Sequence, residues 1–207
     1  MEPPVKRAYA FFDGQNLFRS VKESFGYIYP NYDPAKLAAL VCRQKEWELK
    51  QVYFYTGVPD VSDDPHWNQF WRKKIAYMGK QGIKTFSRPL RYRNQRRKLP
   101  DGNEVPVLVA QEKGIDIRIA LDVVRFAREQ VYDVSILFSQ DQDFSEVAQE
   151  IRAISDLQDR WIKILSAFPS SPTSRNKRGI DKTDWLPLDR ATYDACIDSN
   201  RYTEKKA

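Results

Sequence analysis

The sequence predicts an α/β protein in which helices cover both faces of a mainly parallel central sheet. Short segments rich in apolar, β-branched and aromatic residues alternate along the chain with longer segments whose apolar residues recur at helical spacing. The chain has 207 residues, which suits one domain of ordinary to large size, and 42% of them are hydrophobic, which is enough for a core. In sheets of this kind, functional sites lie beyond the carboxyl ends of the strands.

The first part of the chain predicts three strands and three helices. Residues 7–13 have the composition of a buried strand that ends at Asp13, and Gly26 closes the helix that follows. Asp33 and Pro34 suit the N-cap and the first position of the next helix. The expected strands are 7–13, 50–58 and 83–87, and the expected helices are 14–26, 33–44 and 62–82.

The second part of the chain opens with an irregular, basic segment at residues 88–112. It contains Asp101-Gly102, a tight-turn signal, and therefore predicts a basic hairpin. A helix is expected from Ile115, because apolar residues fall on one face from there on. The remaining expected elements are strands at 134–139 and 161–168, a helix at 143–155, an exposed loop at 169–179, and short pieces around 184–188 and 191–197.

Positive charge is concentrated in one part of the sequence. The net charge is +6, and the stretch from Arg72 to Lys98 contains eleven Lys or Arg and no Asp or Glu. Tyr92 lies among the arginines, which suits phosphate contact with some base stacking. We therefore expect Arg91, Arg93, Arg96 and Arg97 to bind nucleic acid. A solvated helix face and an acidic protein partner are the alternatives.

Several classes of protein are not indicated. No apolar run approaches the roughly 18 residues that a membrane-spanning helix requires. The N-terminus lacks a signal-peptide pattern, because its apolar stretch is short and runs into an aspartate. Cys42 and Cys196 lie far apart and give neither a metal-type spacing nor a disulfide framework. We expect a cytoplasmic protein with reduced thiols and no membrane partner.

The stretch "LFSQDQDF", residues 137–144, ends a buried-looking strand with two carboxylates, Asp141 and Asp143. Like charges this close repel, so water at an exposed turn, a basic side chain or a metal ion must compensate for them. A solvated turn that caps the next helix is the simplest alternative. If the strand of 134–139 lies beside that of 7–13, Asp13 joins the pair at one edge of the sheet.

Carboxylates that converge suit hard divalent cations, which can activate water and hold a phosphate. The segment "EKGIDIRIALD" offers two more aspartates, Asp116 and Asp122. Within one regular helix they differ by about 240° in direction and roughly 9 Å in height, so they do not suit the same ion. Asp116, nearer the entering loop, is the better candidate ligand. Asp122 suits an ion pair with Arg118 or Arg125.

Three motifs in this order resemble the NYN domain, the LabA-like branch of the PIN-type nucleases. They are "FFDGQNL", "EKGIDIRIALD" and "FSQDQDF", and they span residues 9 to about 152. The resemblance implies a PIN-like, three-layer α/β sandwich. It also implies that residues 1–168 form the nuclease domain, with the basic hairpin inserted at about 88–112. Residues 169–207 would be a loop and extension packed on the same domain.

The resemblance further implies cleavage of RNA with Mg²⁺ or Mn²⁺ held by the acidic cluster. Asp13, Asp116, Asp141 and Asp143 would be the catalytic residues and metal ligands, Asn16 and Ser139 would support the site, and Lys113 would contact the nucleic acid. Asn16 could instead bond local backbone, and Ser139 could be a structural hydroxyl. Gln140 and Gln142 depart from the family pattern, in which glycine and a small residue are usual.

The sequence therefore predicts a metal-dependent ribonuclease that binds single-stranded or structured RNA. One alternative is a catalytically weak or inactive module that grips RNA or a protein on a nuclease-like fold. Another is hydrolysis of a phosphate monoester or a nucleotide, since oxygen-bound metals serve those reactions too. A homodimer is left open.

Overall fold

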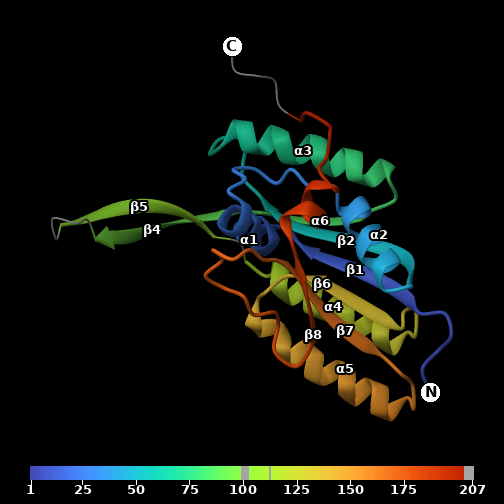
Figure 1. Cartoon of the computed structure of the whole chain (residues 1–207). Helices are drawn as coiled ribbons and strands as arrows, with labels where there is room; N and C mark the ends of the chain where they lie inside the picture. The colour runs from blue at the N-terminus through green and yellow to red at the C-terminus, as the bar shows by residue number, and fades with distance from the viewer. Residues whose placement is uncertain (99–102, 112, 203–207) are drawn as a thin grey trace.

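The computed structural model describes residues 1–98, 103–111 and 113–202, and it has the predicted α/β architecture (Figure 1). Six strands form the central sheet in the order β3-β2-β1-β6-β7-β8, and every neighbouring pair is parallel. The strands are β1 (Arg7–Asp13), β2 (Glu48–Val58), β3 (Lys84–Pro89), β6 (Val134–Phe138), β7 (Lys163–Pro169) and β8 (Asp184–Leu188).

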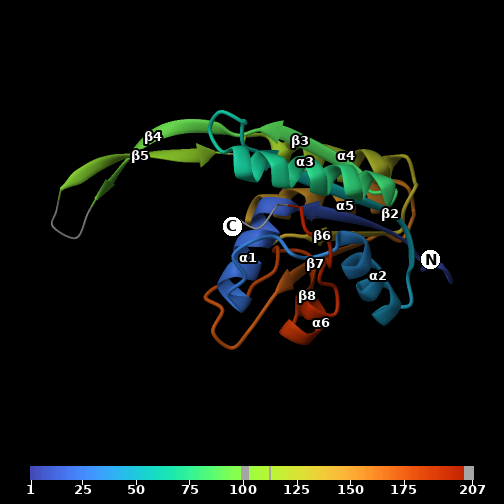
Figure 2. The same ribbon diagram turned by 90° about the horizontal axis from the view of Figure 1, so that it is seen from above.

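Helices cover both faces of this sheet, which makes three layers (Figure 2). On one face lie α1 (Gly14–Phe25), α2 (Pro34–Gln44) and α6 (Arg190–Asp194), and on the other lie α4 (Ile115–Arg128) and α5 (Ser145–Leu157). The helix α3 (Pro65–Lys80) packs beside β2 and β3, and a short 3-10 turn, η1 (Gln142–Phe144), precedes α5. In the part of the chain that the structure describes, no helix is both long and apolar enough to cross a membrane.

The helix boundaries follow the capping residues of the sequence. Asp33 accepts hydrogen bonds from the backbone N–H groups of Ala35 and Lys36, and Pro34 begins α2, as predicted. Gly26 ends α1 in the left-handed conformation, with φ of 79°. Asp13 is both the last residue of β1 and the N-cap of α1, so one side chain fixes the junction between strand and helix.

The segment at 184–188 contributes more than a short piece: it is the sixth strand of the sheet. It pairs in parallel with β7, from Leu165 opposite Asp184 to Pro169 opposite Leu188. Pro187 lacks an N–H group, and an edge strand tolerates this because one side of it needs no ladder partner. The chain beyond residue 168 is thereby attached to the central sheet.

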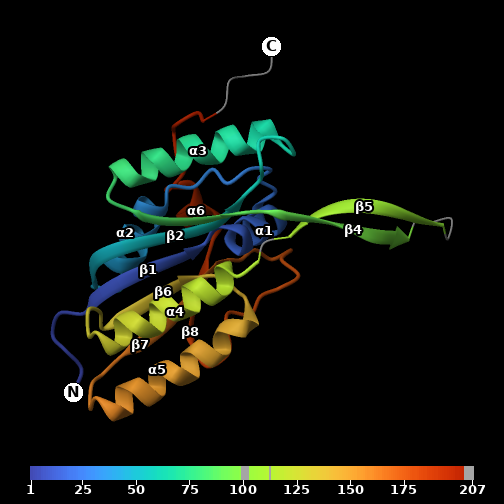
Figure 3. The same ribbon diagram turned by 180° about the vertical axis from the view of Figure 1, so that it is seen from behind.

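The basic segment forms the predicted hairpin. Its strands are β4 (Arg91–Lys98) and β5 (Glu104–Gln111), which pair antiparallel and project from the body as a long arm (Figure 3). The predicted turn at Asp101-Gly102 lies outside the described residues. The hairpin is inserted between the end of β3 and the start of α4, so its base lies at the carboxyl edge of the sheet.

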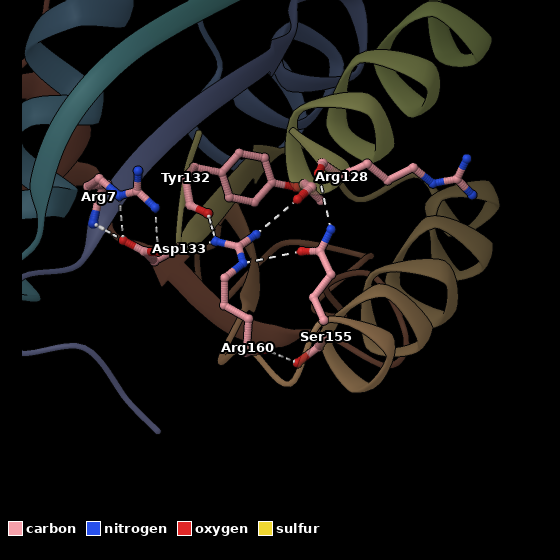
Figure 4. Close-up of polar contacts among 8 residues, drawn as sticks. Arg7, Arg128, Tyr132, Asp133, Ser155 and Arg160 are labelled. Atoms are coloured by element: carbon pink, nitrogen blue, oxygen red, sulfur yellow. Dashed lines mark hydrogen bonds and ion pairs between the residues drawn. The ribbon is translucent and has the colours of Figure 1, made fainter. Parts of the chain in front are cut away.

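The two central strands, β1 and β6, are joined at their amino ends by a partly buried ionic cluster (Figure 4). The Nε and Nη2 atoms of Arg7 each donate to Asp133 at 2.9 Å. Arg160 donates through Nη1 to the carbonyl of Tyr132 at 2.6 Å and through Nη2 to the carbonyl of Ala127 at 2.9 Å. Arg160 Nη1 also lies 3.3 Å from Asp133 Oδ1. Burial alone would raise the pKa of the Asp133 carboxyl, but the hydrogen bonds from Arg7 and the charges of Arg7 and Arg160 lower it below the ordinary value.

Core side chains fill both faces of the sheet. One cluster contains Ala8, Ala10 and Phe12 of β1 with residues of α1, α2 and α3, and the other contains Phe11 with residues of α4 and α5. Between β1 and β6, the rings of Phe12 and Phe138 stack with centroids 3.9 Å apart. Burial on both faces explains why these strands are apolar throughout rather than alternating.

One member of the basic stretch does not face solvent. Lys74 of α3 is fully buried, and its ammonium donates to the carbonyl of Tyr32 at 2.8 Å and to Asp198 at 2.9 Å. Burial lowers the pKa of Lys74, and the pair with Asp198 opposes that effect. In the sequence, Lys74 is one of the eleven bases of this stretch, for which a solvated helix face is one expectation. Its structural role is instead to hold the C-terminal segment against α3.

Removal of Asp198 should therefore destabilise the protein strongly. Asp198→Ala leaves a buried ammonium without its counter-ion, and we expect a loss of about 3–5 kcal/mol in the free energy of unfolding by chemical denaturation. The double variant Lys74→Met/Asp198→Ala, which removes both charges, should recover part of that loss. A loss below about 1 kcal/mol in the single variant, typical of exposed pairs, would contradict the assigned role.

Candidate active site

The adjacency of β1 and β6 places Asp13 and Ser139 together at the carboxyl edge of the sheet. Phe12 and Phe138 are register partners, so the residues that follow them lie at the same level. Ser139 Oγ donates to Asp13 Oδ2 at 3.3 Å, and the backbone N–H of Asn16 donates to Asp13 Oδ1 at 3.0 Å. The prediction from sequence required the strands before Asp13 and Ser139 to be neighbours, and β1 and β6 are neighbours in the sheet.

The Asp13 carboxyl lies in an environment that disfavours its charge. Its exposed fraction is 8%, and burial is the main cause that raises its pKa from the ordinary 3.8 to about 6. The charge of Asp141 raises this pKa further, whereas the hydrogen bonds from Asn16 and Ser139 and the charge of Arg19 lower it. Asp13 and Asp141 are therefore close enough to repel each other, and a cation at this edge would relieve the repulsion.

The turn after β6 is built around Asp141. Its backbone N–H donates to Ser139 Oγ at 3.1 Å, and its Oδ1 accepts from the backbone N–H of Asp143 at 3.1 Å. Asp141 therefore caps η1, as the simplest interpretation of this motif predicts. Its charge also raises the pKa of Asp13. The Asp143 side chain is exposed.

Asn16 joins the first turn of α1 to the same loop. Its side-chain Oδ1 accepts the backbone N–H of Gln140 at 2.9 Å, a contact between residues far apart in the sequence. The alternative, in which the Asn16 side chain bonds only local backbone, is therefore wrong. Asn16 holds the end of β6 against the start of α1 and so fixes the spacing between Asp13 and Asp141.

The two glutamines that depart from the family pattern fasten the C-terminal loop to the site. Gln140 Nε2 donates to the carbonyl of Arg178 at 2.8 Å, and Gln142 Nε2 donates to that of Gly179 at 2.9 Å. The backbone N–H of Asp181 in turn donates to Gln142 Oε1 at 3.1 Å. Sequence reasoning missed this role. Its only signal was two long amides at positions where small residues are usual.

The helix α4 carries the other candidate aspartates, and the structure separates their roles. Asp122 is buried and accepts from Arg118 at 2.9 Å, from Arg125 at 3.0 Å and from the Tyr55 hydroxyl at 2.9 Å. The predicted ion pairs of Asp122 are confirmed. Asp116 lies in the first turn of α4 and is half-buried.

The turn before α4 requires its glycine. Gly114 has φ of 78°, and a Cβ there would lie 2.7 Å from Arg88 Nη1. Arg88 also donates to the carbonyl of Lys113 at 3.3 Å, which links the end of β3 to the start of α4. The Lys113 side chain is exposed. Arg91, Arg93 and Arg96 of the hairpin are exposed too, and the side chain of Arg97 lies outside the description.

The carboxylates at this edge would supply only part of the coordination sphere of an ion such as Mg²⁺. Within residues 1–98, 103–111 and 113–202, no group of three or more His, Cys, Asp or Glu side chains is placed to hold one metal ion. The pair of Asp13 and Asp141 supplies hard oxygen donors. Mg²⁺ usually keeps several waters and is bound through one or two carboxylates together with substrate phosphates. The carboxylates present therefore suit an ion that water and a phosphate also coordinate.

Known proteins resemble this chain along most of its length. The model of the NYN domain family matches residues 7–175. The chain is 26% identical over 143 residues to the low amplitude and bright protein LabA of Synechococcus elongatus, an alignment that covers 69% of this chain and 66% of that relative. A crystal structure of a protein of unknown function from Vibrio parahaemolyticus is similar in fold, with a TM-score of 0.54, 19% identity, and coverage of 95% of this chain and 99% of that one.

The buried charge of Asp13 predicts a pH-dependent gain in stability when it is removed. A carboxyl whose folded-state pKa is raised from 3.8 to about 6 destabilises the fold above that pKa, and the penalty vanishes as the pH falls below its unfolded value. In metal-free buffer at about pH 8, Asp13→Asn should raise the free energy of unfolding by about 2–3 kcal/mol, and by nothing at about pH 3.5. Asp156→Asn, at an exposed position, should change stability little at either pH. Equal effects of Asp13→Asn at both pH values would contradict the electrostatic account.

Proposed function

The chain belongs to the NYN domain family, and from that premise we propose that it is a metal-dependent ribonuclease that hydrolyses phosphodiester bonds. The family has a nuclease-like fold. The observation that carries the proposal is that Ser139 Oγ binds both the Asp13 carboxylate and the backbone N–H of Asp141 at the carboxyl edge of two adjacent strands, where burial makes the Asp13 charge costly without a cation.

Asp13 and Asp141 are the proposed primary ligands. Asp116 and Asp143 do not form a three-ligand group with them in the described structure, and they are proposed as further catalytic residues that would act on the ion through its bound water. Mg²⁺ or Mn²⁺ bound there would supply a polarising charge for the phosphate and a water with a lowered pKa. Asp13 is held by the N–H of Asn16 and the hydroxyl of Ser139, so one carboxylate orientation is fixed before any ligand arrives. Ser139 in turn accepts the backbone N–H of Asp141, so one hydroxyl binds both the Asp13 carboxylate and the backbone that carries Asp141.

The hairpin is the proposed contact surface for the nucleic acid. It projects from the edge that carries the aspartates, and Arg91, Arg93 and Arg96 are exposed along its first strand. Arg96 lies 3.6 Å from Glu104, a long ion pair, and 83% of its own side chain is exposed, so its charge is available to phosphates. Arg97 and Lys113 complete the proposed binding set.

An RNA-binding module without catalysis is the second candidate. The observation that favours it is that the described residues contain no three-ligand group, so the metal would be held weakly in the absence of substrate. Binding without cleavage in the presence of Mg²⁺ and of Mn²⁺ would establish this alternative.

Substitution of the paired aspartates should abolish cleavage of single-stranded RNA. Asp13→Asn and Asp141→Asn remove the charge that would hold the ion, and we expect no cleavage above background with Mg²⁺ or Mn²⁺. Ser139→Ala keeps both carboxylates but removes the hydroxyl that donates to Asp13 and accepts the backbone N–H of Asp141, and a loss of roughly 10–100-fold is expected. Asp156→Asn is the matched control at an exposed position distant in sequence from the motifs. Cleavage that survives Asp13→Asn, or that persists in EDTA, would reject the mechanism.

Neutralisation of the hairpin should weaken RNA binding in a salt-dependent way. If the three arginines contact phosphates, Arg91→Gln/Arg93→Gln/Arg96→Gln should lower the slope of log affinity against log salt by about 2, since each contact to a single strand contributes about 0.7. The control is Arg43→Gln/Lys45→Gln/Lys50→Gln, which removes the same charge near the amino edge of the sheet. Equal slopes for the two triple variants, measured by fluorescence anisotropy, would exclude the hairpin as the contact surface.

A further inference from the structure

A cavity of about 450 Å³ lies beside the proposed catalytic edge, between α1, α3 and the base of the hairpin. Its volume falls within the range of about 300–1,000 Å³ that is typical of ligand sites. The side chains that define its character are four aromatic rings, two cations and one carboxylate: Phe18, Trp67, Trp71, Tyr92, Arg19, Lys22 and Asp64. None of these residues belongs to the motifs that carry the proposed catalysis.

The rings form a wall with faces available for stacking. Phe18 of α1 and Trp67 of α3 have centroids 6.4 Å apart at 51°, so they line the cavity from two elements. Trp67 is half-buried and Tyr92 is half-buried, which leaves part of each ring accessible, whereas Trp71 is buried behind them. Base–aromatic stacking contributes strongly to the binding of single strands and tolerates every base.

The two cations favour an anionic ligand. Arg19 and Lys22 are exposed, and neither forms an ion pair with any other described residue. Arg19 lines the cavity, and its charge also lowers the pKa of the Asp13 carboxyl, so the cavity and the acidic edge share this cation. A ligand with an aromatic ring and a phosphate could stack on the aromatic side chains and pair with the two cations at the same time.

The position of the cavity connects the hairpin to the catalytic edge. Gly14, the residue after Asp13, lines it on one side, and Leu90 and Tyr92 at the base of the hairpin line it on the other. A strand that runs along the hairpin toward Asp13 would therefore pass over this opening. A base in a duplex is stacked and paired, so only an unpaired base can enter a side pocket of this kind.

We propose that this cavity is a subsite for one unpaired base of a single-stranded RNA, with Trp67 and Tyr92 as stacking surfaces and Arg19 and Lys22 as phosphate contacts. The inference rests on the proposed function, which supplies the path of the RNA toward the aspartates. It adds a binding site for a base, and the residues of that site lie outside the aspartate cluster. It makes the protein selective for single strands over duplexes. An isolated nucleotide and an acidic peptide are the competing occupants.

The test compares two ligands in EDTA, where no cleavage occurs. One is a short fluorescein-labelled single-stranded RNA, and the other has the same sugar–phosphate backbone with abasic sites. Trp67→Ala and Tyr92→Leu should each weaken binding of the base-containing strand by about tenfold and leave binding of the abasic strand unchanged. Trp161→Ala is the matched control, since Trp161 lies before β7 at the amino edge of the sheet.

A second variant separates stacking from folding. Trp67→Phe retains an aromatic ring, so it should keep most of the affinity, and RNA should quench less of its tryptophan fluorescence than in the unmodified chain. Equal losses for the base-containing and abasic strands, or no loss in either pocket variant, would overturn the subsite, as would equal affinity for a duplex of the same sequence. Because binding is measured without metal, an inactive protein with base-dependent binding would reject the nuclease and keep the subsite. Metal-dependent cleavage together with RNA binding that Trp67→Ala does not change would keep the nuclease and reject the subsite.

Discussion

The parallel pairing of β1 with β6 is the constraint on which the site depends. Asp13 lies as many residues after Arg7 as Ser139 lies after Asp133, and both ends of the strand pair are joined by side chains. At the amino end, Arg7 and Arg160 neutralise Asp133; at the carboxyl end, Ser139 and Asn16 hold the site. A slip of register by one residue would break the ionic cluster and exchange the two faces of each strand, so the position of Asp13 follows from the core.

The electrostatics of the two ends differ in kind. Asp133 is buried beside two guanidinium groups and its charge is stabilised, whereas Asp13 is buried beside another carboxylate and its charge is not. The sheet therefore concentrates an unmatched negative charge at the edge where the hairpin and Arg19 present positive charge. Under the proposed function, an anionic substrate would approach through the positive surface and would reach the carboxylates only where a cation offsets their repulsion.

Local sequence signals were sufficient for most of the fold. Asp33-Pro34, Gly26 and the apolar spacing after Ile115 each determine structure within a few residues, and the helices begin and end where they indicate. The placement of Asp13 with Ser139 needed one further rule, that parallel strands end at a common edge. The ion pairs of Asp122 followed from helical geometry alone.

The features that sequence could not supply depend on contacts between distant residues. Lys74 looked like one more surface base because its partner, Asp198, comes from the C-terminal segment. Residues 184–188 looked like an isolated piece because their pairing with β7 is decided by the sheet and not by their composition. The aromatic cavity draws its walls from α1, β2, α3 and the base of the hairpin, so no motif marks it.

The contacts of Gln140 and Gln142 with the C-terminal loop should make the protein resistant to proteolysis. By composition, residues 170–179 are an easy target for trypsin, with Arg175, Lys177 and Arg178 close together. Yet Gln140, Gln142 and Glu23 bind the backbone of this loop at several points. A protease must extract the loop before it can cut, and that extraction would pull on the turn that carries Asp141. Resistance to digestion and integrity of the acidic edge should therefore be lost together.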